Sequence, residues 1–152
     1  MAGTMPESLT LRYVSMLEGA RAPQYAHGPA EDAGMDLFAA QDVVLEPGSW
    51  KSVRTGIGIE IPEGYEGQVR PRSGLARRHG LTLLNSPGTI DPGYRGEVRV
   101  TLINFGPNAY RIRPGDRIAQ LVVASYAAVR WELAKSLGES SRGTCGFGST
   151  GR

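Results

Sequence analysis

The stretch Trp50-Lys-Ser-Val-Arg-Thr-Gly-Ile-Gly-Ile-Glu-Ile61 alternates apolar side chains with polar residues or glycine, most regularly at its end, where isoleucine occupies every second position. Alternation with period two puts the apolar side chains on one face of a β-strand, whereas a helix requires spacings of three and four. The stretch therefore predicts β-structure with one buried face.

Short alternating runs of the same kind recur along the chain, at Leu9–Met16, Glu97–Ile103 and Arg117–Val123. Turn signals lie between the runs: Pro47-Gly48, Pro62-Glu-Gly64, Pro92-Gly93 and Pro114-Gly115. Short strands separated by such turns predict an all-β sandwich or barrel. One short helix is expected around Gly74–His79, where Gly80 would end it.

Length and composition narrow the class of protein. The chain has 152 residues, which suffices for one domain with a proper core, and its formal net charge is only +2. Its single cysteine, Cys145, excludes an intrachain disulfide and a metal cluster built on thiolates. No apolar run approaches the roughly 20 residues of a membrane span. We therefore expect a cytoplasmic protein that binds neither nucleic acid nor membrane.

The C-terminal stretch Arg142-Gly-Thr-Cys-Gly-Phe-Gly-Ser-Thr-Gly151 combines glycines with an arginine, an aromatic ring and two hydroxyl groups. Backbone N–H groups, hydroxyls and arginine suit phosphate oxygens, and a phenylalanine ring offers a face for stacking. The composition is typical of a lid that orders over a nucleotide, or of a disordered tail. From Leu137 to the end, the chain could span about 50 Å, enough to reach a neighbouring subunit.

Three internal segments could carry chemistry. Asp91 precedes a Pro-Gly turn, so its carboxylate could orient and deprotonate a water, or could serve the turn alone. Ser73 and Gly74 stand where a short helix would begin, beside Arg72, which suits an anion or a capped helix with a basic face. Asp36 is a lone carboxylate that could hold Mg²⁺ through water, or could be an ordinary strand-end aspartate.

Two side-chain amides, those of Asn85 and Gln120, each have two possible roles. Asn85 could hydrogen-bond the edge of a base or cap a turn, and Gln120 could enter a polar site or face solvent.

The order and spacing of five segments resemble those of the trimeric dUTP pyrophosphatase (dUTPase) family along nearly the whole chain. The five segments are Ala33–Leu37, Arg72–Ala76, Gly88–Gly96, Gly115–Leu121 and Arg142–Gly151. Each motif alone is weak, but five in sequence make a specific signal.

This resemblance implies a jelly-roll-like, distorted β-barrel with one short helix, formed by residues 1–137, and a glycine-rich lid formed by residues 138–152. It also implies a homotrimer with active sites at subunit interfaces, and it leaves open which subunit donates which residue. The implied reaction is Mg²⁺-assisted hydrolysis of dUTP to dUMP and pyrophosphate. That reaction would limit uracil incorporation into DNA and supply dUMP for dTMP synthesis.

The resemblance also implies roles for individual residues. Asp91 would activate the water that attacks the α-phosphorus, Asp36 would contact hydrated Mg²⁺, and Tyr94 would lie against the deoxyribose. The implied substrate-binding residues are Arg72, Ser73, Gly74, Asn85, Gly88, Thr89, Ile90, Tyr94, Gln120, Arg142, Phe147, Gly148, Ser149 and Thr150. Among these, the Phe147 ring would cover the uracil.

Two other functions are compatible with such a scaffold. A dCTP deaminase would share the barrel and the phosphate site, but we expect no glutamate beside the hairpin to attack the pyrimidine ring. A non-catalytic trimeric nucleotide-binding protein would not need Asp91. The dUTPase function is therefore the main expectation.

Overall fold

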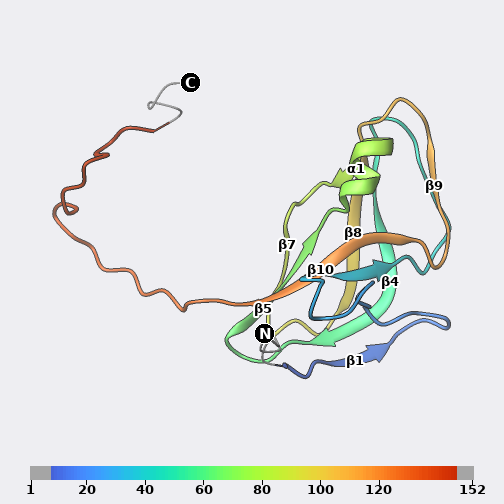
Figure 1. Ribbon diagram of the computed structural model, residues 1–152, viewed down its shortest axis with the longest axis horizontal. Helices are drawn as coiled ribbons and strands as arrows, with labels where there is room; N and C mark the ends of the chain where they lie inside the picture. The colour runs from blue at the N-terminus through green and yellow to red at the C-terminus, as the bar shows by residue number, and fades with distance from the viewer. Residues whose placement is uncertain (1–7, 147–152) are drawn as a thin grey trace.

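The computed structural model describes residues 8–146 and consists almost entirely of antiparallel β-structure (Figure 1). The strands are β1 (Arg12–Ser15), β2 (Met35–Phe38), β3 (Val43–Leu45), β4 (Trp50–Glu60), β5 (Tyr65–Arg70), β6 (Leu81–Leu83), β7 (Gly88–Ile90), β8 (Glu97–Asn104), β9 (Tyr110–Ile112) and β10 (Arg117–Ser125). The helix α1 spans Ser73–His79. Within residues 8–146, no helix is long and apolar enough to cross a membrane.

The strands form two four-stranded sheets, in the orders β1-β4-β8-β6 and β2-β10-β5-β7, and a two-stranded sheet, β3-β9. Both larger sheets contribute to one hydrophobic core: Val53 and Val100 come from the first, and Val69 and Leu121 from the second. The predicted all-β, jelly-roll-like fold with one short helix is confirmed.

The alternating stretch that begins at Trp50 becomes a single long strand, β4, whose Ile57 and Ile59 side chains are 1% and 4% exposed. Strands β8 and β10 also begin where the sequence predicted them, whereas β1 is shorter than the predicted run Leu9–Met16. The helix ends as expected: Gly80 has φ 68°, and its N–H donates to the Ala76 carbonyl. That φ is in the left-handed region, which glycine adopts most easily.

The end of β8 carries a fully buried polar side chain, Asn104. Its Nδ2 donates to the carbonyls of Leu45 (2.9 Å) and Asn108 (2.8 Å), and its Oδ1 accepts from the Gly106 N–H (2.8 Å). One amide therefore holds the β8–β9 connection against β3.

We expect Asn104→Ala to destabilise the protein by about 2–4 kcal/mol, because three hydrogen bonds are lost and buried backbone groups are left unpaired. Chemical denaturation of the variant measures this change. Asn108→Ala is the matched control, because the exposed Asn108 contributes its backbone carbonyl to the cluster. A loss under about 0.5 kcal/mol for Asn104→Ala would contradict the structural role.

Beyond β10 the chain leaves the body as an extended arm, residues 126–146 (Figure 1). Every second side chain over Val129–Leu133 is apolar, and Trp131 and Leu133 are 92% and 102% exposed. Alternating apolar residues without cover in their own chain are typical of a strand that packs elsewhere.

Candidate active site

One cluster of predicted site residues forms around Asp36 on β2. Arg72 Nε lies 3.1 Å from Asp36 Oδ1, and Arg117 Nε lies 3.0 Å from Asp36 Oδ2. Gln120 on β10 is the register partner of Asp36, so three of the five sequence motifs meet here. We call Asp36, Arg72, Arg117 and Gln120 the phosphate cluster. Two guanidinium groups against one carboxylate give it a net positive charge.

Gln120 is fixed within this cluster. Its Nε2 donates to the Pro71 carbonyl at 3.0 Å. A Cβ atom on Gly34 would lie only 2.5 Å from Gln120 Oε1, so the amide lies directly against this glycine of the first motif. The amide is therefore held next to the segment that leads into α1.

Ser73 and Gly74 form the first turn of α1, and Arg72 is its N-cap without a side-chain capping hydrogen bond. The first backbone N–H groups of a helix have no partner within the helix and suit anionic oxygens. Arg78 Nη2 would lie 3.0 Å from a Cβ atom on Gly74, so a further guanidinium lies against this turn. Cations and free N–H groups together can bind a chain of phosphates.

The same cluster fits hydrated Mg²⁺ better than a directly bound ion. Over residues 8–146, no group of three or more His, Cys, Asp or Glu side chains is placed to hold a metal. Asp36 already has a guanidinium against each carboxylate oxygen. Because Mg²⁺ usually keeps several of its waters, a contact from Asp36 through one of them is the compatible arrangement.

A second cluster surrounds the hairpin around β7 and lines a cavity of about 200 Å³. The predicted residues that line it are Asn85, Gly88, Thr89, Ile90, Asp91 and Tyr94. The Tyr94 N–H donates to the Asp91 carbonyl at 3.1 Å, which closes the Pro-Gly turn and leaves the Asp91 residue exposed. We call this cavity and its lining the nucleoside pocket.

Tyr94 is fixed from two sides. Its hydroxyl donates to the Glu97 carbonyl at 2.9 Å. A Cβ atom on Gly96 would lie 2.5 Å from the same hydroxyl oxygen, so the ring packs directly over this glycine. The ring therefore forms a firm wall of the pocket.

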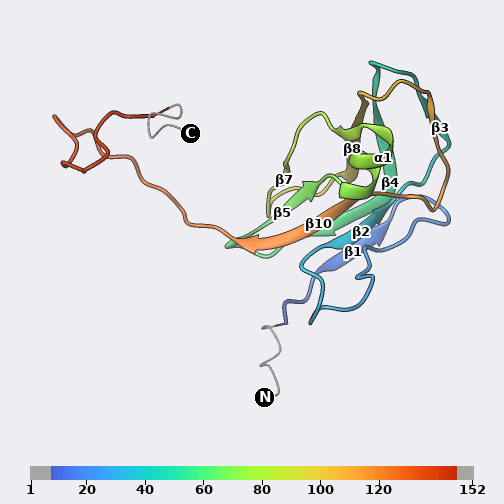
Figure 2. The ribbon, with the colours of Figure 1, turned by 45° about the horizontal axis from the view of Figure 1, so that its top comes forward.

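The two clusters are not adjacent within one chain. In the register, Asp36 and Gln120 are level with Arg70, whereas Ile90, next to Asp91, is level with Gly67. Three strand spacings separate β2 from β7 (Figure 2), or about 14 Å, and three residues along the strand add about 10 Å in the other direction. That separation exceeds the length of a triphosphate group, so a single chain does not bring the two clusters to one phosphorus atom.

The fifth motif is likewise apart from both clusters. Arg142 lies in the arm, where its Nε donates to the Cys145 carbonyl at 2.8 Å. Both overall views show the arm pointing away from the body (Figures 1 and 2). Phe147, Gly148, Ser149 and Thr150 lie outside the described residues.

Sequence reasoning missed two residues of these clusters, Arg117 and Glu97. Both lie in alternating strands, where a charged residue is usually a solvated one, and only the register shows that they face partners. Glu97 also stands beside the hairpin, where it lines the nucleoside pocket. Its carboxylate is held by Arg54 (3.0 Å) and Arg99 (3.3 Å), so it is not a free base.

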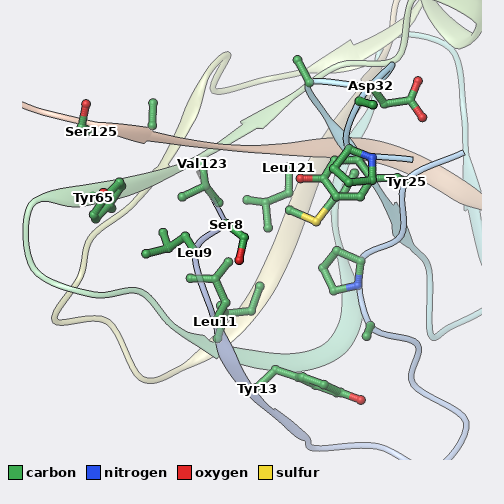
Figure 3. A pocket seen from close by; sticks show the side chains of 18 of the residues that line it. Ser8, Leu9, Leu11, Tyr13, Tyr25, Asp32, Tyr65, Leu121, Val123 and Ser125 are labelled. Carbon is green, nitrogen blue, oxygen red and sulfur yellow. The ribbon is translucent and has the colours of Figure 1, made fainter. Parts of the chain in front are cut away.

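A larger cavity, of about 870 Å³, lies elsewhere and contains none of the predicted site residues. Its walls come from the segment before β1, from the segment that leads into β2 and from β10 (Figure 3). Leu9, Leu11, Leu121 and Val123 point into it. Its lining is mostly apolar, which suits a protein segment better than a triphosphate. We call it the apolar groove.

Known proteins resemble this chain over most of its length. A family model described as dUTPase matches residues 20–151. A deoxyuridine 5'-triphosphate nucleotidohydrolase of Solibacter usitatus is 62% identical over 130 residues, which cover 86% of this chain and 88% of that protein. A protein of the same name from Clostridium tetani is 50% identical and covers 94% of this chain and 97% of its own length.

Solved structures agree with the fold. The dUTPase of Staphylococcus bacteriophage 80alpha with dUPNHPP has a TM-score of 0.85 and 30% identity, and the match covers 95% of this chain and 100% of that one. A mutant dUTPase from phage phi11 of S. aureus, described with a structural Mg(II) ion, has a TM-score of 0.78 and 28% identity. That match covers 84% of this chain and 98% of the phage protein.

Proposed function

Because the chain belongs to the dUTPase family, the dUTP diphosphatases, we propose that it hydrolyses dUTP at a composite site, built from the phosphate cluster of one subunit and the nucleoside pocket of another. The products are dUMP and pyrophosphate. The observation that carries this proposal is the separation of the two clusters within one chain. We further propose a cytoplasmic enzyme that limits uracil incorporation into DNA and supplies dUMP for dTMP synthesis.

Asp91 is the general base of the proposed reaction. Its carboxylate takes a proton from a water whose oxygen forms a bond to the α-phosphorus, while the bond from that phosphorus to the bridging oxygen breaks. Pyrophosphate leaves with the electron pair of the broken bond. The exposed carboxylate on a closed turn is suited to this role, because attack on phosphorus depends chiefly on position and charge stabilisation.

The phosphate cluster binds the triphosphate. Arg72, the N–H groups of Ser73 and Gly74, and the Gln120 amide contact its oxygens, and Asp36 would hold hydrated Mg²⁺ through water. When bound to the phosphates, Mg²⁺ supplies charge neutralisation and orientation. The ion pairs of Asp36 with Arg72 and Arg117 keep these groups in place before substrate arrives.

The nucleoside pocket selects uracil and deoxyribose. The Asn85 amide and the backbone groups of Gly88, Thr89 and Ile90 bind the edge of the base, so a wrong base leaves buried groups unpaired. Tyr94 lies against the deoxyribose, where its ring leaves no space for a 2′-hydroxyl. The tail, with Arg142, Phe147, Gly148, Ser149 and Thr150, then closes over base and phosphates as a lid.

The proposed assembly is a homotrimer. A composite site needs more than one chain, and two apolar surfaces of this chain support association: the exposed side chains of the arm and the apolar groove. Burial of side chains as exposed as Trp131 would stabilise an assembly by roughly 25 cal/mol per Å² of apolar area.

Trp131→Glu is therefore expected to weaken the trimer by at least tenfold in subunit affinity, because a charged side chain replaces the largest apolar group of the arm. Analytical ultracentrifugation over a dilution series measures this change. Glu132→Gln, at the neighbouring position of the arm, is the matched control. An unchanged trimer in Trp131→Glu would remove the arm from the interface.

A pyrophosphate-release assay with dUTP, dCTP, dTTP and UTP tests the proposed reaction. We expect kcat/KM to be at least 10²-fold higher for dUTP than for the other three nucleotides. The pocket fits the hydrogen-bonding edge of uracil and a sugar without a 2′-hydroxyl. Ammonia release from dCTP would favour the deaminase instead. Absence of pyrophosphate from dUTP with Mg²⁺ would favour a non-catalytic nucleotide-binding protein.

A further inference from the structure

We infer that Glu97 is a positioning residue that determines sugar selectivity by holding the ring of Tyr94 in place. This inference rests on the proposed function, in which Tyr94 faces the deoxyribose. Neither the family motifs quoted above nor the sequence pattern gives Glu97 a role. The inference depends on the connections of its side chain and of its backbone.

The Glu97 side chain is only 9% exposed, and its carboxylate contacts three groups of the β1-β4-β8-β6 sheet. Arg54 Nε donates to both carboxylate oxygens at 3.0 Å, and the Gly56 N–H donates to Oε1 at 2.9 Å. Arg99 Nη2 lies 3.3 Å from Oε2. Arg54 is the last paired residue before the irregularity in the pairing of β4 with β8, and Gly56 lies within it, so this one carboxylate fixes the start of β8 onto β4.

The next residue strengthens the same attachment. Thr55 Oγ1, between Arg54 and Gly56 on β4, donates to the Val98 carbonyl on β8. The first two residues of β8 are therefore joined by side-chain bonds to consecutive residues of β4. A backbone joined this way has little freedom to shift.

The backbone of the same segment holds Tyr94. The Tyr94 hydroxyl donates to the carbonyl of Glu97 itself, and its ring packs over Gly96. The Glu97 carbonyl accepts the hydrogen bond and Gly96 lies beneath the ring, so any shift of the backbone from Gly96 to Val98 moves both. Tyr94 is 44% exposed, and the two contacts above tie its side chain to this segment, so the anchored backbone sets where the ring stands.

Selectivity is the property that this arrangement controls. Exclusion of a 2′-hydroxyl needs the ring within contact distance of the sugar, and a shift of about 1 Å is enough to admit an added oxygen. The phosphate cluster and Asp91 have no bond to the Glu97 carboxylate among the contacts of residues 8–146. Loss of the carboxylate should thus alter discrimination between sugars more than turnover of dUTP.

The experiment compares Glu97→Gln with the wild type by isothermal titration of dUMP and UMP, and by kcat/KM for dUTP and UTP. Gln keeps the shape and can still accept from the Gly56 N–H, but it loses the charge that pairs with Arg54 and Arg99. We expect the ratio of dUMP to UMP affinity to fall about tenfold, the scale of one altered contact in a discriminating pocket. We expect kcat for dUTP to fall by a smaller factor than this ratio.

Two further variants separate positioning from general destabilisation. Asp42→Asn removes another carboxylate–arginine pair, on the distant β3–β9 sheet, where Arg111 hydrogen-bonds Asp42 and holds the pKa of that carboxyl below its usual value. We expect no change in selectivity from it. In a Tyr94→Ala background, Glu97→Gln should have no further effect on selectivity, because the ring through which it acts is gone.

Unchanged sugar selectivity in Glu97→Gln, or an undiminished effect in the Tyr94→Ala background, would overturn the inference. If Glu97→Gln does not fold, Arg54→Lys serves in its place, because it weakens the same attachment of Glu97 to β4. The same measurements are then made on Arg54→Lys. The affinities for dUMP and UMP can be measured without turnover. A protein that binds these nucleotides but does not hydrolyse dUTP would contradict the proposed function and would still test this inference.

Discussion

Asp91→Asn is expected to lower kcat for dUTP hydrolysis by about 10²–10⁴, the usual range for the loss of a general base. Asparagine has nearly the same shape, and the turn is closed by the main-chain carbonyl of residue 91 and not by its side chain. The KM should therefore change little, and the loss should lie in the chemical step. Single-turnover measurement of pyrophosphate release separates an effect on substrate binding from an effect on the chemical step.

The control for this prediction is Glu46→Gln, which removes an exposed carboxylate outside both clusters. Thermal unfolding and sedimentation of Asp91→Asn should match the wild type. Near-normal kcat in Asp91→Asn would remove the residue from the catalytic role and would favour another base.

Deletion of residues 138–152 is expected to lower kcat/KM for dUTP by about 10²-fold, because the lid both binds the phosphates and holds the reacting groups in position. The trimer should persist, because the deletion leaves the apolar side chains from Val129 to Leu133 intact. Steady-state kinetics and sedimentation measure the two properties. A fully active truncated enzyme would refute the lid.

Mixing the two impaired proteins gives a sharper test. If one site takes Asp91 and the tail from different chains, mixed trimers of Asp91→Asn and truncated subunits contain some sites with both parts intact. Activity should then reappear after subunit exchange. If both parts come from the same chain, no site in a mixed trimer is complete, and activity does not rise above that of the unmixed proteins.

Much of the fold could be predicted from the sequence because its long strands have regular alternation. Strands β4, β8 and β10 each bury every second residue over part of their length, and the sequence shows this directly. Strands of three or four residues are too short for a period to be seen. In β5, Gly67 takes an inward position without a side chain, so the apolar pattern of that strand is interrupted as well.

The candidate site was predictable as separate motifs but not as two clusters. Motif order identified Asp36, Arg72 and Gln120, and the structure brings these three together. The partners of these motifs were not predictable, because they depend on strand register. Arg117 pairs with Asp36 across β10 and β2, and Glu97 pairs with Arg54 across β8 and β4. Neither pair has a signature in local sequence.

The distance between β2 and β7 has a consequence for how such an enzyme would behave in a cell. An isolated subunit would carry a phosphate cluster and a nucleoside pocket but no complete active site. Total activity would therefore rise more steeply than in proportion to protein concentration, until all subunits are associated. At low expression, the enzyme would be silent without any inhibitor. Newly made chains could not act on nucleotide until they had found their partners.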